Sequence, residues 1–158
     1  MDITFKTEQG RFNYRVCGII IHGEKILAMK NGRTPYYFLP GGRVRLGETV
    51  EEAVVRELRE ELEIDAKIAR PLWFNQGFFN EDVTGEQFHE ICLYFLMDIS
   101  HTDLLSKGET FTLHEGTQRH SFEWLAFERL KEEYFYPVFL KEKIFDLPET
   151  LTIIENYD

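Results

Sequence analysis

Residues 42–64 read GRVRLGETVEEAVVRELREELEI, in which a glycine-led loop runs into a helix. Thr49, followed three residues later by Glu52, forms a capping box that marks the start of this helix. Val54, Leu58 and Leu62 recur at helical spacing and mark a buried stripe. These signals predict a helix over residues 50–62 that packs against the rest of the chain.

Three glutamates, Glu57, Glu60 and Glu61, project from one edge of that stripe. Surface helices usually place opposite charges four residues apart, but Glu57 and Glu61 have no basic residue at position 53 or 65. A solvated acidic face is one interpretation. A bound cation is the other, because carboxylate oxygens at this spacing suit Mg²⁺ or Mn²⁺, whose remaining ligands are waters and substrate phosphates.

A pair of glycines, Gly41 and Gly42, precedes the helix and follows strand-like sequence. Glycine lets the backbone turn and approach a ligand closely, because it has no Cβ. Arg43 and Arg45 alternate directly after the pair, and their side chains either contact phosphates or remain in solvent. The four residues therefore predict a ligand-binding loop beside the acidic edge.

The composition favours one folded domain over residues 1–158 and argues against several classes of protein. Lys and Arg number 18 and Asp and Glu number 28, so the net charge is −10, which argues against a nucleic-acid-binding surface. A phosphate-bearing ligand would therefore need a divalent cation. No leader-like N-terminus and no membrane-spanning apolar run is present, and Cys17 and Cys92 are expected to be reduced core residues of a cytoplasmic protein.

Hydrophobic periodicity predicts a mixed order of strands and helices. Strands are expected at 11–21, 25–30, 36–40, 66–78, 87–99, 122–127 and 151–156, helices at 50–62, 128–133 and 137–145, and a loop over 100–120. This order predicts the α+β class, with a mixed central β-sheet between layers of helices.

The stretch 42–64 resembles the signature of the Nudix hydrolases: G, five residues, E, seven residues, then R-E-U-x-E-E-x-G-U, where U is a bulky aliphatic residue. The matching positions are Gly42, Glu48, Arg56, Glu57, Leu58, Glu60, Glu61 and Ile64. One position departs, because Glu63 stands where the family has glycine. We therefore expect the helix to end in a non-glycine cap or an extra half-turn.

The resemblance implies an α/β/α sandwich that cleaves the diphosphate of a nucleotide or of a nucleoside diphosphate linked to another moiety. Mg²⁺, or Mn²⁺, held by Glu57, Glu60 and Glu61 would neutralise the phosphates and activate a water, with Glu60 and Glu61 the more direct ligands. Glu48 and Arg56 would complete or orient this shell. The signature does not fix which carboxylate is the general base.

A catalytically silent Nudix-fold module that binds a nucleotide as a sensor or regulator is a second hypothesis. An acidic protein-interaction domain without metal is a third. The intact Glu57, Glu60 and Glu61 favour the enzyme, because a pure binder does not need three unneutralised charges. The expected partner is a nucleotide-linked small molecule, with no nucleic acid and no membrane, and a homodimer is compatible with the sequence but not required by it.

Further candidates lie outside the signature. Glu90 shares a strand face with Phe88, Cys92 and Tyr94, so it is either an extra ligand or base, or the partner of a Lys or Arg. His114 and Glu115 could reach the site from the long loop. The segment FNED at 79–82 lacks the proline or tyrosine that marks some family subgroups, so it indicates no substrate. One or two of five aromatic residues are expected to stack on a base: Tyr36, Tyr37, Phe74, Phe78 and Phe79.

Overall fold

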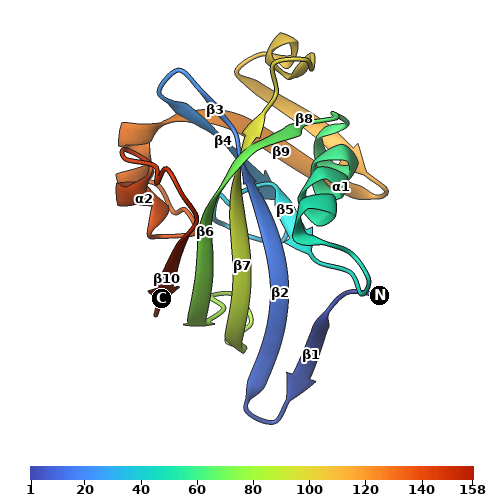
Figure 1. Cartoon of the computed structure of the whole chain (residues 1–158), viewed down its shortest axis with the longest axis vertical. Helices are drawn as coiled ribbons and strands as arrows, with labels where there is room; N and C mark the ends of the chain where they lie inside the picture. The colour runs from blue at the N-terminus through green and yellow to red at the C-terminus, as the bar shows by residue number, and fades with distance from the viewer.

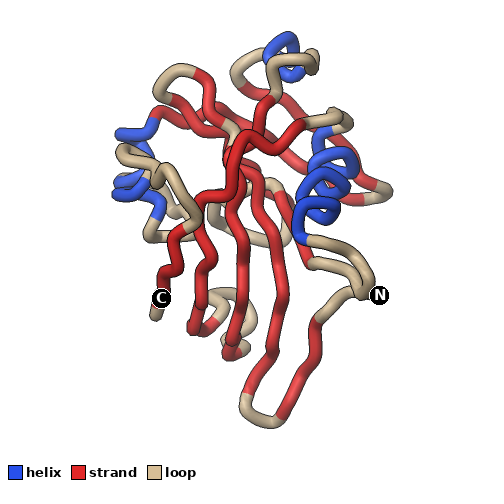
Figure 2. The backbone as a smooth tube through the Cα atoms, viewed as in Figure 1, coloured by secondary structure: helices blue, strands red, loops and turns tan.

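The computed structural model describes residues 1–158 as two β-sheets with helices at opposite sides (Figures 1 and 2). The larger sheet has the order β1-β2-β7-β6-β10, with β5 paired to β2, and the smaller sheet has the order β3-β4-β9-β8. The strands of the larger sheet are β1 (Thr4–Thr7), β2 (Gly10–Ile19), β5 (Gly41–Arg43), β6 (Lys67–Asn80), β7 (Gln87–Asp98) and β10 (Thr152–Asn156). Those of the smaller sheet are β3 (Ile21–His22), β4 (Lys25–Asn31), β8 (Thr110–Glu115) and β9 (Gln118–Ala126).

The larger sheet is mixed, as predicted. Strand β7 runs parallel to β2, and β10 runs parallel to β6, whereas the other pairs are antiparallel. Helices α1 (Val50–Leu62) and α2 (Leu140–Lys143) lie on opposite sides of the molecule in Figure 1, and two 3-10 helices, η1 (Leu104–Lys107) and η2 (Phe127–Lys131), complete the structure. This confirms the α+β class and the sandwich arrangement. No helix combines the length and the apolar sequence needed to cross a membrane.

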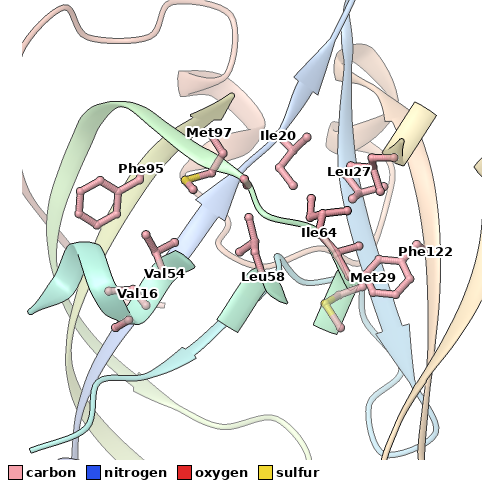
Figure 3. Close-up of a cluster of buried hydrophobic side chains, with 14 of the residues drawn as sticks. Val16, Ile20, Leu27, Met29, Val54, Leu58, Ile64, Phe95, Met97 and Phe122 are labelled. Carbon is pink, nitrogen blue, oxygen red and sulfur yellow. The ribbon is translucent and has the colours of Figure 1, made fainter. Parts of the chain in front are cut away.

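Helix α1 begins where the sequence predicts. The Glu52 N–H donates to Thr49 Oγ1 at 3.1 Å, which satisfies one of the free N–H groups of the first turn. The buried stripe of α1 packs in one core cluster with residues of β2 and β7, and Figure 3 shows Val54 and Leu58 of the helix among Val16, Ile20, Phe95 and Met97. This contact fixes the position of the helix and therefore of its acidic edge.

Helix α1 approaches β2 closely because of a glycine. A Cβ placed on Gly18 would lie 3.0 Å from Leu58 Cδ1, tighter than ordinary van der Waals contact. The core between α1 and the two sheets has 16 buried residues, and a second core of 15 lies between the sheets and α2. Cys17 and Cys92 belong to the second core as free, buried thiols, which agrees with the prediction for both.

The strand predicted over 36–40 is wrong. Tyr37 and Phe38 make only single bridges, to Phe135 and Met29, because the flanking prolines at 35 and 40 have no N–H to donate to a ladder. The glycine pair expected in a loop instead lies in β5, where residues 41–43 pair with residues 15–17 of β2. The N-terminal strand β1 was not predicted.

The loop predicted over 100–120 is also wrong, because this segment contains η1, β8 and the start of β9. In β8, Phe111, Leu113 and Glu115 are half-buried and alternate with exposed residues. The threonines, histidine and glutamate of this strand conceal its period of two in the sequence. The helix predicted over 137–145 is shorter, since α2 spans only Leu140–Lys143, and the helix predicted at 128–133 is the 3-10 helix η2.

Helix α1 is capped at Glu63, the position where the sequence departs from the family signature. Glu63 adopts the left-handed conformation, with φ 59° and ψ 35°, and its N–H donates to the Arg59 carbonyl at 3.1 Å. A left-handed residue other than glycine is strained by its Cβ. The predicted non-glycine cap is confirmed, and the helix ends at Leu62 as the sequence predicts.

We expect Glu63→Gly to stabilise the protein by about 0.5–1 kcal/mol, because relief of the left-handed strain outweighs the added freedom of glycine in the unfolded chain. Thermal melts should show a rise of about 2–3 °C. The matched control is Glu132→Gly, at a helix end whose φ is −95°, where glycine relieves no strain and should destabilise. A lower melting temperature for Glu63→Gly would contradict the expectation.

Candidate active site

The buried carboxylate of Glu61 joins α1 to β5. The Gly41 N–H donates to Glu61 Oε1 at 2.8 Å, and the residue is only 6% exposed. No Lys, Arg or His forms an ion pair with Glu61. Burial raises the pKa of Glu61 well above its usual value, and the nearby charge of Glu57 raises it further. A buried, uncompensated carboxylate is costly, which is typical of a position that takes a ligand.

Arg56 holds the neighbouring carboxylates in place. Its Nε and Nη2 donate to the two oxygens of Glu48 at 2.6 and 2.9 Å, and its Nη1 donates to Glu57 Oε1 at 2.9 Å. The same Nη1 lies 3.3 Å from Glu60 Oε2, and Nη2 donates to the Arg43 carbonyl at 3.1 Å. Bonding to the Arg56 guanidinium lowers the pKa of Glu48 to about 2.

The sequence predicts that Glu57 has no basic partner, and this prediction is wrong. The guanidinium of Arg56 reaches the adjacent residue as well as the one four positions on, because its five donors point in several directions. Burial nevertheless raises the pKa of Glu57, although Arg56 acts to lower it. Glu61 alone lacks a cationic partner, so the prediction of an uncompensated charge holds for that residue.

The two glycines of β5 are required by close contacts within the protein. A Cβ on Gly42 would lie 2.4 Å from Glu57 Oε1, and one on Gly41 would lie 2.2 Å from the Val16 carbonyl oxygen. The side chain of Glu57 therefore packs directly on the backbone of β5. This arrangement aligns the acidic edge of α1 with the strand that follows Pro40.

The hairpin of β8 and β9 brings two more groups to Glu61. Ligand atoms of Glu61, Glu115 and His120 lie within 4.8 Å of one another. His120 Nε2 lies 3.1 Å from Glu115 Oε1, while His120 Nδ1 is buried without a partner. Glu115 was among the sequence candidates. His114, the residue before it, is exposed on the opposite face of β8.

His120 was missed in the sequence. Its signal is alternation along β9, where His120, Phe122 and Trp124 point inward in turn. The predicted loop ends at residue 120 and the predicted strand begins at residue 122, so His120 fell outside the predicted strand.

A cavity of about 600 Å³ adjoins this site, floored by the larger sheet. Gly42 and Arg43 line it, as do Arg15 and Glu90, whose Nη1 and Oε1 are 4.0 Å apart. Burial raises the pKa of Glu90, while Arg15 acts to lower it. Arg45 is not part of the cavity, because it lies on the rim beside Asp2 and Glu60.

Aromatic side chains form part of the cavity wall. Of the five aromatic candidates, Tyr36 and Phe79 line the cavity, whereas Tyr37, Phe74 and Phe78 do not. Tyr36 Oη donates to Glu81 at 3.2 Å, and Tyr136 Oη donates to Asp82 at 2.7 Å. These bonds tie the turn between β6 and β7 to the segments that cover the cavity.

A helix edge rich in carboxylates thus lies beside a glycine-containing strand and a polar cavity, and carboxylate oxygens are the donors that suit a hard divalent cation. The family model of the NUDIX domain matches residues 12–143, and the chain belongs to the Nudix family. Strands β1 and β10 lie outside the matched residues.

An ADP-ribose pyrophosphatase of Methanocaldococcus jannaschii is 39% identical to this chain over 87 residues, which cover 53% of this chain and 49% of that protein. The chain thus matches about half the length of this relative. A MutT protein from Bacillus halodurans has a similar structure, with a TM-score of 0.61 and 14% identity over 92% of this chain and 89% of that one. A UDP-X diphosphatase has a TM-score of 0.60 and 15% identity, covering 90% of this chain and 66% of that one. The two structural matches show the shared fold.

We expect Glu61→Gln to stabilise the protein in EDTA at pH 8 by about 1 kcal/mol, which corresponds to about 2–4 °C in Tm. Glutamine keeps an oxygen for the Gly41 N–H but has no charge to desolvate. Because folding raises the pKa of Glu61, its contribution to stability is lost as the pH rises through the folded-state pKa, so the gain from glutamine should be smaller at pH 5.

Thermal melts at the two pH values measure this difference. Glu52→Gln, on the exposed face of the same helix, is the control and should change Tm by no more than about 1 °C. A lower Tm for Glu61→Gln than for wild type at pH 8 would show that the Glu61 carboxylate does not destabilise the metal-free protein.

Proposed function

We propose that this protein is a Mg²⁺-dependent pyrophosphohydrolase that cleaves the diphosphate linkage of a nucleotide or of a nucleoside diphosphate joined to a small molecule. The observation that carries the proposal is the buried Glu61, which has no cationic partner and adjoins further carboxylates and a polar cavity. Membership of the Nudix family supports it. The cytoplasm is the proposed location, since both cysteines are free thiols.

The donor set fits a hard divalent cation. Glu57, Glu60 and Glu61 lie along one edge of α1, and carboxylate oxygens are the ligands that Mg²⁺ and Mn²⁺ prefer. The ligand atoms that lie within 4.8 Å of one another belong to Glu61, Glu115 and His120. We assign Glu57, Glu60 and Glu61 to the metal, with Glu115 approaching Glu61 from β8. When bound, the cation would neutralise the diphosphate and acidify the attacking water.

The other site residues position this set. Arg56 locks Glu48, Glu57 and the Arg43 carbonyl into one network, so its role is to orient the ligands. Arg15 and Arg43 line the cavity and present positive charge to the phosphates.

Hydrolysis requires water to attack one phosphorus while the bridging P–O bond breaks, and a base must accept the proton of that water. Glu115 suits this role because it is half-buried beside Glu61 and has the imidazole of His120 to orient it. Glu90 lies across the cavity floor against Arg15, so we assign it to holding that arginine toward the substrate.

The proposed activity predicts Mg²⁺-dependent hydrolysis of at least one member of a panel of nucleotides and nucleoside diphosphate derivatives. Glu57→Gln, Glu60→Gln and Glu61→Gln should each lower kcat/KM by about 100-fold or more, because each removes one negative ligand. Glu52→Gln, from the exposed face of α1, is the control and should remain within about twofold. Equal rates for wild type and Glu61→Gln would refute the assignment, and a Tm unaffected by Mg²⁺ would argue for a domain without metal.

The two carboxylates outside α1 should differ in their kinetic effects. Glu115→Gln should lower kcat by about 100-fold or more, as loss of a general base does, with little change in KM. Glu90→Gln should act mainly on KM, because it frees Arg15 from its partner. Steady-state kinetics on the substrate found in the panel measures both, and the reverse pattern would exchange the two roles.

A further inference from the structure

The floor of the cavity contains a row of side chains that crosses four strands. Asn13 of β2 pairs in register with Glu90 of β7, Glu90 pairs with Gly77 of β6, and Gly77 pairs with Asn156 of β10. Directly paired residues point to the same face of a sheet, and all four of these residues line the cavity. The row therefore forms one continuous polar surface.

Gly77 leaves an open place in this row. Its φ is not in the left-handed region, and an added Cβ would meet only Phe79, at 3.5 and 3.6 Å, and Asn75 Nδ2, at 3.7 Å, which are ordinary contacts. Neither the backbone nor the packing of the protein therefore requires glycine here. The missing side chain leaves bare sheet between Glu90 and Asn156, where a flat group could lie.

A pair of amides borders this open place. Asn156 Nδ2 donates to Asn75 Oδ1 at 2.5 Å, and Asn75 is only 6% exposed. One amide N–H₂ and one amide C=O remain without a partner in the chain, whichever way the two amides are oriented. Such a donor and acceptor side by side match the hydrogen-bonding edge of a nucleobase. Tyr36 and Phe79 supply aromatic surface on the same cavity.

Several charged side chains of the cavity lie in two groups, and Asp2 and Arg33 also belong to its lining. Arg15 and Arg43 lie toward Gly42 and α1, where the proposed function places the diphosphate. Acceptors gather at the other end, where Glu81 and Asp82 of the β6–β7 turn and Asp158 beyond β10 also line the cavity. Carboxylates repel a second anionic group and favour one with several N–H donors.

We propose that this row, together with Asn75, is the subsite for the nucleobase, and that it selects bases with an exocyclic amino group over their keto counterparts. The orientation of the substrate rests on the proposed function, which fixes the diphosphate at the arginine end. Strand β10, which supplies Asn156, lies outside the residues matched by the family model.

Binding of non-hydrolysable analogues tests the subsite without turnover. The probes are the α,β-methylene diphosphates of adenosine against inosine and of cytidine against uridine, each with Mg²⁺ in a calorimeter. The amino-bearing member should bind about tenfold tighter or more in each pair, because its keto counterpart places an acceptor where the cavity presents carboxylate oxygens and the free amide carbonyl.

Two variants on different strands complete the test. Asn156→Leu should reduce the preference within each pair to about twofold or less, and Gly77→Val should weaken every probe by about tenfold or more, since it fills the floor. Glu155→Gln is the matched control, because Glu155 is exposed beside Asn156 on β10 and does not line the cavity. Thermal melts establish that each variant is folded.

Equal affinities within both wild-type pairs, or a preference that survives in both folded variants, would overturn the subsite. Hydrolysis of amino and keto substrates with equal kcat/KM would overturn it as well, while the proposed function would stand. Amino-selective binding without hydrolysis of any nucleotide in the panel would support the subsite and refute the hydrolase. Failure to bind any probe would overturn the subsite, while hydrolysis of the panel decides the proposed function separately.

Discussion

The hydrogen bond from the Gly41 N–H to the buried carboxylate of Glu61 is the contact on which the site depends. It joins the last turn of α1 to β5, and it places a negative charge where little water can solvate it. An apolar residue at position 61 would pack there at less cost. A positive ligand bound at Glu61 would compensate this charge, and the proposed chemistry depends on that compensation.

The contacts of Arg56 explain why Glu61 is the carboxylate of this edge that lacks a cationic partner. One guanidinium binds Glu48 with two hydrogen bonds, reaches Glu57 and Glu60, and caps the Arg43 carbonyl. These contacts hold most of the acidic edge in one geometry before any ligand arrives, which is the condition for precise metal binding. The same network leaves no guanidinium donor for Glu61.

Segments far apart in the sequence complete the site around α1 and β5. The β8–β9 hairpin contributes Glu115 and His120, and the sheet floor contributes Arg15 and Glu90. Strand β10 then adds Asn156 from outside the residues that the family model matches. The proposed metal-binding edge thus lies within the matched residues, whereas the proposed selection among bases draws on a strand outside them.

The sequence by itself determined α1, its cap at Thr49 and its acidic edge, and it placed the glycine pair beside that edge, although in a loop and not in β5. These features depend on residues close together in the chain, where a period of 3.6 and the need for a missing Cβ leave a readable pattern. It also placed Glu90 on an inward strand face, because that inference needs only a period of two.

Only the tertiary structure decided that Glu61 alone lacks a cation, that Glu115 and His120 reach it, and that Asn156 meets Asn75. The first depends on how Arg56 uses its donors, and the other two depend on the register between strands far apart in the chain. That register is set by the packing of both cores and leaves no local periodicity for the sequence to reveal.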